Sequence, residues 1–392
     1  MIVWRTHMFL ELKSTLTSCL LSLIARHRSG ASVNLSLLKG VIDSYVALGV
    51  EDSDGARGST EVYEEHFQTA FLDATRAYFK AESSQFILEH SVSEFLIKVE
   101  HRIEEEERRV QLYLHDSTRK LLVRVCDEEL LAAHQDVIAE DFKAMLADDR
   151  EGDLSRVYAL MGRLATGLDP LRRYFEAHVK SVGLSAIDAI ADNAENDPKQ
   201  YVDALLTVHR KYSDLVSRSF RSDATFVASL DKACREIVNR NAACAKSTTK
   251  SPELLARFCD SILKKSAKNP EESKLEDVLK SVMVVFKYVE DKDVFQKFFS
   301  KMLAKRLIGG VSVSEEAEES MIGKLKEACG FEYTSKLHRM FNDVQTSRDL
   351  NGEFQMAAKS DSTKGEEKGK GKGKGKGRVN RGKRGLIWVN MG

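Results

Sequence analysis

Apolar side chains recur at every third or fourth position along most of this chain, which is the spacing that places them on one face of an α-helix. No strand-like alternation of apolar and polar residues interrupts the first 134 residues. Only four prolines occur in 392 residues, which favours long uninterrupted helices. In this first part the pattern predicts helices over about 1–25, 35–48, 63–78, 92–114 and 117–134.

A second block repeats this organisation. Asn34 and Asp153 each precede a Leu-Ser pair as the expected helix N-cap, and they lie 119 residues apart. With about five helices per block, this spacing predicts a repeat of about 110–120 residues. Such units stack as a solenoid because each buries its apolar face on the next. The helices predicted in the second block cover 132–146, 154–164, 171–182, 201–220 and 226–239.

Three more one-faced helices are predicted in a row between Lys250 and Ile308. Ser251 is the expected N-cap of the first, and Asn269-Pro270 ends it. Phe286 lies on the broad apolar face of the second helix. Because helices of this kind are not stable alone, we expect them to pack together as a bundle. The last turns of the third helix carry cations that suit the negative end of the helix dipole, namely Lys297, Lys301, Lys305 and Arg306.

After the bundle helices the composition changes. Two helices are predicted over Glu315–Cys329 and Thr334–Gln355, with Gly330 ending the first of them. Lysine and glycine then alternate strictly over 368–377, and no core can be built from these residues. We therefore predict that 356–392 is a disordered basic tail. From Ala357 onward, 11 Lys and Arg stand against 3 Asp and Glu, whereas the whole chain has a net charge of zero.

Three segments of the sequence resemble the cullin family. They are KSPELLARFCDSILKKSAKNPEES from Lys250, MVVFKYVEDKDVFQKFFSKMLAKRLI ending at Ile308, and CGFEYTSKLHRMF ending at Phe341. The KSPE opening and the DVF…LAKRL pattern are shared among cullins, and the segment ARFCDSILKKSAKNPEE is most similar to the cullin-1 branch. The resemblance covers about Val3–Gln355.

The resemblance implies an all-α, elongated solenoid and a function. The chain would be a non-catalytic scaffold of a cullin-RING (SCF-type) ubiquitin ligase. Its implied partners are a Skp-type adaptor with an F-box protein, and a RING-box protein. The implied domains are the second cullin repeat at 1–130, truncated at its N-terminus, the third repeat at 131–248, a partial four-helix bundle at 249–355, and the tail at 356–392.

The resemblance also implies that the binding ends of the scaffold lie elsewhere. In the family the first repeat holds the adaptor, and the C-terminal domain holds the RING-box protein and accepts the neddylation modifier. We therefore expect a truncated form that lacks both ends and does not assemble a working ligase by itself. We assign no catalytic, cofactor-binding or metal-ligating residue to any position, and expect no cofactor and no small-molecule substrate.

Charge and cysteine usage agree with a protein of the cytoplasm and nucleus. The main body has no excess of cations that would attract membrane or nucleic acid. Six cysteines are scattered without a repeated short spacing, as in reduced intracellular proteins. No run approaches 18 continuous apolar residues, so we expect no transmembrane helix. The segment 16–25 resembles the apolar part of a signal peptide, but Glu11 and Lys13 precede it, which favours a packed helix.

Several local patterns could be mistaken for chemical sites. Glu64-Glu65-His66 and the run from His101 to Glu107 place carboxylates near imidazoles, as solvated helix faces do by chance. On the second of these faces Glu105 precedes Arg109 by four residues, so we expect an exposed ion pair. The Gly-Lys pairs follow no strand and lack the Ser or Thr of a phosphate-binding loop. Asn34 is a helix cap rather than a glycosylation site, and the aromatic run 286–299 is bundle core.

Two other classes of function remain open from the sequence. The cations of the tail could contact nucleic-acid phosphates without reading sequence, and salt-dependent RNA retention that is lost on deleting 357–392 would indicate this. An all-α enzyme is the other class, and no motif supports it.

Overall fold

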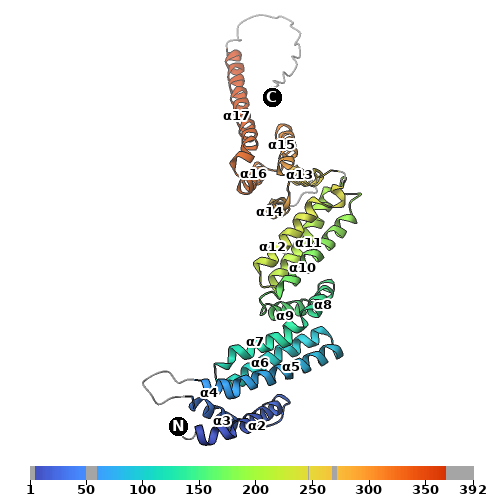
Figure 1. Cartoon of the computed structure of the whole chain (residues 1–392). Coiled ribbons are helices and arrows are strands. Elements are labelled where there is room, and N and C mark those ends of the chain that lie inside the picture. The colour runs from blue at the N-terminus through green and yellow to red at the C-terminus, as the bar shows by residue number, and fades with distance from the viewer. Residues whose placement is uncertain (1–4, 50–59, 246, 267–271, 368–392) are drawn as a thin grey trace, which may run out of the picture. The chain divides into compact units, whose positions relative to one another are not determined.

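The computed structural model describes residues 5–49, 60–245, 247–266 and 272–367 (Figure 1). Within these ranges the chain is helical, and its only β pairing is an isolated antiparallel bridge between Lys264 and Ser312. The predicted all-α fold class is therefore confirmed. Contacts divide the chain into two compact units, unit 1 (Met1–Cys259 and Asp277–Phe295) and unit 2 (Asp260–Glu276 and Gln296–Gly392). The predicted boundaries of the repeats, bundle and tail stay predictions.

Unit 1 contains the helices of both predicted blocks. Its α-helices are α2 (Leu10–Arg28), α3 (Leu35–Ala47), α4 (Glu61–Tyr63), α5 (Thr69–Glu89), α6 (Val92–Leu112), α7 (Thr118–Cys126), α8 (Gln135–Ala147), α9 (Glu151–Met161), α10 (Leu168–Asp188), α11 (Pro198–Ser219) and α12 (Ala224–Asn239). Short π and 3-10 segments are η1 (Arg5–Phe9), η2 (Glu64–Gln68), η3 (Asp127–Leu131), η4 (Ala132–His134) and η5 (Ala242–Cys244). Three helices cross the division between the units: α13 (Lys250–Leu263), α14 (Glu272–Tyr288) and α15 (Lys292–Gly309).

Side chains at the helix starts satisfy backbone N–H groups that have no partner within the helix. The Asn34 side chain accepts a hydrogen bond from the Leu37 N–H at 3.0 Å, as predicted. Ser91 and Glu94 form a capping box at the start of α6, each side chain accepting from the other residue's N–H. At the end of α16, Gly330 has a φ of +86°, which a residue without Cβ adopts at little cost.

Two of the predicted N-caps are wrong. Because α13 begins at Lys250, Ser251 lies inside the helix, where its hydroxyl is buried and accepts a hydrogen bond from Tyr201. Because α9 begins at Glu151, Asp153 also lies inside its helix, where it accepts a hydrogen bond from Ser93 at 2.6 Å. In both cases the partner comes from a helix remote in sequence, which the local pattern does not show.

Three helices of unit 1, α10, α11 and α12, lie side by side (Figure 1). Aromatic rings fill the space between them and α9. The Phe220 and Phe226 ring centroids are 4.3 Å apart, and Phe175 meets both rings edge to face or nearly so. Gly183 lets α10 approach α12 closely, since a Cβ at this position would collide with the Ile237 side chain. The core of unit 1 is thus densely packed.

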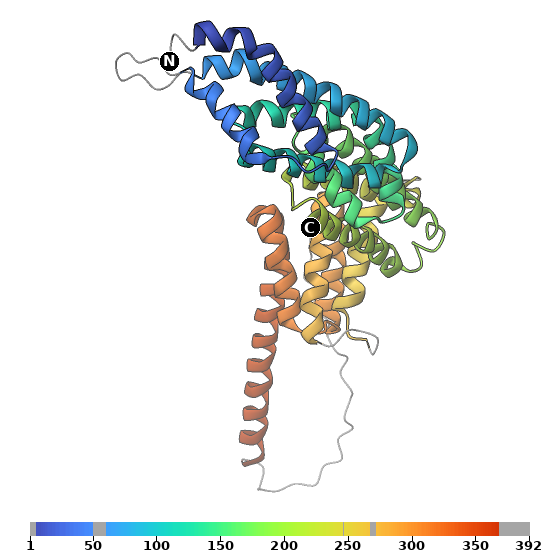
Figure 2. The same ribbon diagram turned by 90° about the horizontal axis from the view of Figure 1, so that it is seen from below.

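Unit 2 contains α16 (Glu315–Cys329), which has the predicted bounds, and α17 (Phe331–Glu367). Leu325, Leu337 and Met340 lie buried in this unit. Helix α17 continues past the predicted end at Gln355, and Figure 2 shows its C-terminal part in red. The good helix formers Ala357 and Ala358 follow that position, and extending a formed helix costs little. Disorder was predicted for 356–392, and this is wrong for 356–367, which belong to α17. The remaining part, 368–392, lies outside the described residues.

Within the described residues one segment, His7–Arg28, is long and apolar enough to cross a membrane. The sequence analysis, by contrast, expected no transmembrane helix. Core helices of soluble proteins and N-terminal signal sequences meet the same criterion. In the structure Leu20, Ile24 and Arg28 are buried, and Arg28 pairs with Glu106 of another helix. These contacts are those of the packed helix that the sequence predicted.

Candidate functional site

The residues considered as candidate chemistry do not gather in one place. The His66 and Glu65 side chains approach to 3.8 Å, and the exposed His101 and Glu104 side chains to 4.0 Å. No group of three or more His, Cys, Asp or Glu in the described ranges could hold a metal ion. Phe286 is fully buried with its ring centroid 4.9 Å from that of Phe295, so its assignment to the core is confirmed.

Instead, polar side chains gather inside the structure, where they join helices that are distant in sequence. The first group, here the Glu106 cluster, consists of Arg28, Thr75, Glu106 and Arg109. Arg28 donates two hydrogen bonds to the Glu106 carboxylate at 2.8 and 2.9 Å and a third to Thr75 at 2.8 Å. Glu106 is only 2% exposed. The cluster joins α2, α5 and α6.

The Glu106 cluster also corrects one prediction. Arg109 was expected on a solvated face of α6 with Glu105, but Arg109 is buried and donates to Glu106 at 3.0 Å. Its contact with the half-exposed Glu105 is longer, at 3.6 Å. The sequence does carry a signal for this arrangement, because Glu106 falls at helical spacing between the apolar residues Ile103 and Val110. A carboxylate at that position must be paired when buried.

A second group, the Tyr201 cluster, lies where α11, the end of α12 and the start of α13 meet. The Tyr201 hydroxyl donates to the Ser251 Oγ at 2.9 Å and accepts from the Asn241 side chain at 2.9 Å. Asn241 also donates to the Ile237 carbonyl at 2.7 Å and accepts from the Cys244 N–H at 3.2 Å. All three residues of the cluster are buried. The contacts fix where α13 begins relative to α12.

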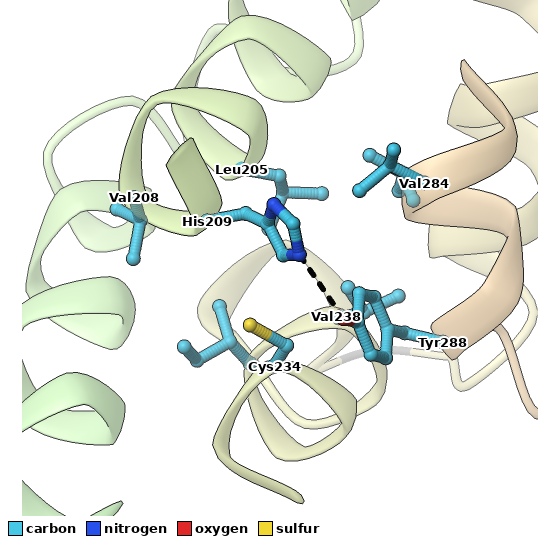
Figure 3. A pocket seen from close by; sticks show the side chains of 9 residues that line it. Leu205, Val208, His209, Cys234, Val238, Val284 and Tyr288 are labelled. Carbon is cyan, nitrogen blue, oxygen red and sulfur yellow. Dashed lines mark hydrogen bonds between the residues drawn. The ribbon is translucent and has the colours of Figure 1, made fainter. Parts of the chain in front are cut away.

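A third group, the Tyr288 cluster, joins α14 to α11 and α12. The Asn239 side chain donates to the Tyr288 carbonyl at 2.8 Å and accepts from the Glu290 N–H at 3.0 Å. Asn239 thereby satisfies the backbone at the C-terminal end of α14. The Tyr288 hydroxyl donates to Asp231 at 2.6 Å and lies 3.1 Å from the His209 Nε2 (Figure 3). Since the phenol proton is used by Asp231, His209 donates its Nε2 proton to Tyr288.

Burial sets the protonation states in this cluster. It lowers the pKa of His209 more than the nearby Asp231 carboxylate raises it, so the imidazole is neutral. Burial also acts to raise the pKa of Asp231, but hydrogen bonds from Lys287 and Tyr288 hold that pKa below its ordinary value. The apolar side chains in Figure 3 enclose a cavity of about 10 Å³, which is about the space of one water molecule. This volume leaves no room for a small-molecule substrate.

The fourth group, the Glu318 cluster, lies within unit 2. Arg306 donates to both Glu318 oxygens, at 2.7 and 2.9 Å, and to the Asp260 carboxylate. Ser312 adds a hydrogen bond to Glu318 at 2.8 Å. Arg306 was predicted as one of the cations that suit the negative end of the helix dipole, and in the structure it is buried, as is Glu318. Burial acts to lower the pKa of Arg306, and the two carboxylates more than offset this effect.

The four clusters have a structural role, because they join helices to one another. Their donors and acceptors point at one another across helix boundaries, and buried polar groups of this kind tolerate only one arrangement of their partners. Removing one partner leaves a buried charge or dipole unsatisfied, which costs far more than an exposed pair contributes. The described residues thus hold their helices at fixed mutual positions within each unit.

Comparison with known proteins gives a consistent result. A family model described as the cullin alpha solenoid domain matches residues 1–351. Cullin-1 of Dictyostelium discoideum is 51% identical over 356 residues, 90% of this chain and 46% of that relative. Cullin-1 of Schizosaccharomyces pombe is 41% identical over 92% of this chain and 48% of its own length. Cullin-1 of Caenorhabditis elegans is 42% identical over 91% and 47%. The chain spans about half the length of the curated relatives it matches.

Proposed function

Because this chain belongs to the cullin family, we propose that it acts as a scaffold segment of a cullin-RING ubiquitin ligase. The proposal includes an SCF-type complex, with a Skp-type adaptor, an F-box protein and a RING-box protein as partners of the complete scaffold. It also includes a location in cytoplasm and nucleus. The observation that carries it is the match of the family model to residues 1–351, together with relatives that share 41–51% identity over about nine tenths of the chain.

A scaffold contributes geometry rather than bond chemistry. In a ligase of this class the segment between the substrate receptor and the RING module sets the distance that ubiquitin must cross. A segment with this task needs helices that do not slide or tilt against one another. The buried Glu106, Tyr201 and Tyr288 clusters support such a role in unit 1, because the hydrogen bonds of each cluster join different helices and would be lost if these helices moved apart. We infer that these clusters keep the spacing constant.

A chimera tests the proposed function. Residues 1–351 replace the matching segment of the Dictyostelium cullin-1, and the chimera is combined with the adaptor, F-box and RING-box proteins in a ubiquitin-chain assay. We expect chain formation by the chimera within a few-fold of the parent cullin. A second chimera, in which a Gly/Ser linker of equal residue number replaces the segment, should fall to the level without scaffold, because a flexible linker does not fix the distance.

The comparison between the two chimeras decides the result. Circular dichroism and a cooperative unfolding transition first establish that the first chimera is folded. A folded chimera that is no more active than the linker version would contradict the proposal. Equal activity of the parent and the linker version would show that spacing does not matter, and this would contradict the mechanism.

A further inference from the structure

A pocket of about 430 Å³ lies within unit 2, beside the turn at Gly330 that joins α16 to α17. One side chain from the last turn of α16 contributes to it, and the others come from positions of α17 whose spacing places them on one face of that helix. The lining residues are Lys326, Phe331, Ser335, His338, Arg339 and Asn342. The volume is that of a pocket that holds a small ligand.

The lining carries positive charge that no carboxylate compensates. Lys326 and Arg339 contribute two cations, and the six described residues of the lining include no Asp or Glu. Within the part of the chain that the structure describes, neither cation forms an ion pair. Arg306 of the same unit, by contrast, pairs with Glu318 and Asp260. Two cations that line one pocket without a carboxylate favour an anionic ligand.

His338 adds a buried nitrogen whose hydrogen bonding is incomplete. The His338 Nε2 is buried and has no hydrogen-bond partner among the described residues. The His338 ring stacks with that of Phe331, with the ring centroids 6.4 Å apart and the planes at 20°. Buried polar atoms in native proteins nearly always have a partner. The pocket that His338 lines is therefore the place from which a ligand completes this hydrogen bonding.

Phe331 gives the same pocket an apolar rim. Its side chain is 61% exposed, which is unusual for a phenylalanine. The Lys326 ammonium lies 5.7 Å from the centroid of the Phe331 ring, so a charged and an apolar contact are adjacent. A ligand that carries an anionic group on an aromatic ring would use both contacts.

The donor groups of the lining favour phosphate over carboxylate. Lys326, Arg339 and Asn342 together offer more N–H donors than the oxygens of one carboxylate can accept. A phosphate monoester presents one more strong acceptor oxygen than a carboxylate does. The planar guanidinium of Arg339 also matches two phosphate oxygens at once. A phosphate monoester thus uses this donor set more fully.

We propose that the pocket binds an aromatic phosphate monoester. The phosphate group lies between Lys326 and Arg339, and the aromatic part of the ligand packs on Phe331. The site consists of residues of unit 2 alone. It is separate from the proposed scaffold function, which rests on the clusters of unit 1.

Nuclear magnetic resonance of His338 in the full 392-residue chain tests this proposal. The histidines are labelled with ¹³C at Cε1, and H338Q identifies the His338 signal among those of the ten histidines. We expect phenyl phosphate to shift the His338 signal saturably. Inorganic phosphate should bind several-fold more weakly, because it has no ring to pack on Phe331. F331S should bring the two ligands to the same affinity.

Three charge variants separate the pocket from the general charge of the chain. K326Q and R339Q should each weaken the binding of phenyl phosphate about tenfold, because each removes a charge-assisted hydrogen bond. K336Q is the matched control, since Lys336 is exposed on α17 and does not line the pocket. It removes the same charge as K326Q and should leave the affinity unchanged. Circular dichroism establishes that each variant is folded.

Each contrary outcome has its own meaning. A His338 signal that phenyl phosphate does not shift saturably would overturn the proposal. Equal weakening by K326Q and K336Q would also overturn it, because it would show attraction by net charge alone. Benzoate carries the same ring on a carboxylate, so binding as tight as that of phenyl phosphate would contradict the choice of phosphate. An affinity for phenyl phosphate that F331S leaves unchanged would contradict the role given to Phe331.

Discussion

Helices α10 to α12 of unit 1 and the C-terminal part of α17 are both helical and have very different surroundings. Phe175, Phe220 and Phe226 are fully buried between neighbouring helices, whereas Phe354 is exposed on α17. In unit 1 the Tyr201 cluster shows inward-facing polar side chains that are paired with one another. The comparison shows that apolar spacing reports helix formation, whereas burial depends on which other element covers the helix.

The largest expected effect compares one phenylalanine from each surrounding. Phe286→Ala should destabilise the protein by about 3–5 kcal/mol, because it leaves a cavity in a closed core. Phe354→Ala should change the free energy of unfolding by less than about 0.5 kcal/mol, as exposed positions do. Urea unfolding followed by circular dichroism measures both. Equal losses for the two variants would show that the burial contrast is wrong.

The next effect compares two carboxylates of α6. Glu106→Gln should cost about 3 kcal/mol, because the buried Arg28 and Arg109 lose the charge that compensates them. Glu105→Gln should cost less than about 1 kcal/mol, since Glu105 is half exposed and water replaces its contacts. The two variants change the same atoms one residue apart, so they are matched. If Glu105→Gln lowered the free energy of unfolding as much as Glu106→Gln, the side of α6 that carries Glu105 would have to be buried.

The sequence was enough to predict the helices and the family, because both depend on local patterns. The predicted bounds Glu315–Cys329 are those of α16, and Asn34 is the predicted cap. The partners within the buried clusters could not be predicted, since they come from segments far apart in the sequence. Arg28 and Glu106, for example, are 78 residues apart. Ser251 shows the same limit: local rules make it a cap, and only Tyr201 explains its buried position.

A third effect should appear with pH. Burial is the main cause that lowers the pKa of His27, His134, His178 and His209, all in unit 1. The unfolded chain therefore binds protons at a higher pH than the folded one, so stability falls as the pH drops below about 6.5. Unfolding in urea at several pH values between about 7.5 and 5.5 measures this slope. The double variant H178Q/H209Q should flatten it, and an unchanged slope would contradict the assignment.

The smallest effect concerns a helix start. Ser91→Ala removes one half of the capping box of α6 and should cost about 1 kcal/mol. Ser335→Ala on α17 is the control, because its hydroxyl bonds only to the local Glu332 carbonyl, and it should cost little. Thermal unfolding of both variants checks the difference. A loss at Ser335 that equals the loss at Ser91 would mean that the capping box contributes nothing of its own.

The central claim is that the buried clusters hold the helices of unit 1 in one arrangement, as a spacer requires. Spin labels on the exposed Cys19 of α2 and on an introduced V227C of α12 measure it directly by pulsed dipolar spectroscopy. Burial protects the other thiols of unit 1 from labelling, for example by raising the pKa of Cys234 to about 12. The half-exposed thiol of Cys329 in unit 2 is removed by C329S. We predict a single narrow distance distribution that broadens in Glu106→Gln. A broad or two-peaked distribution in the parent protein would contradict the account.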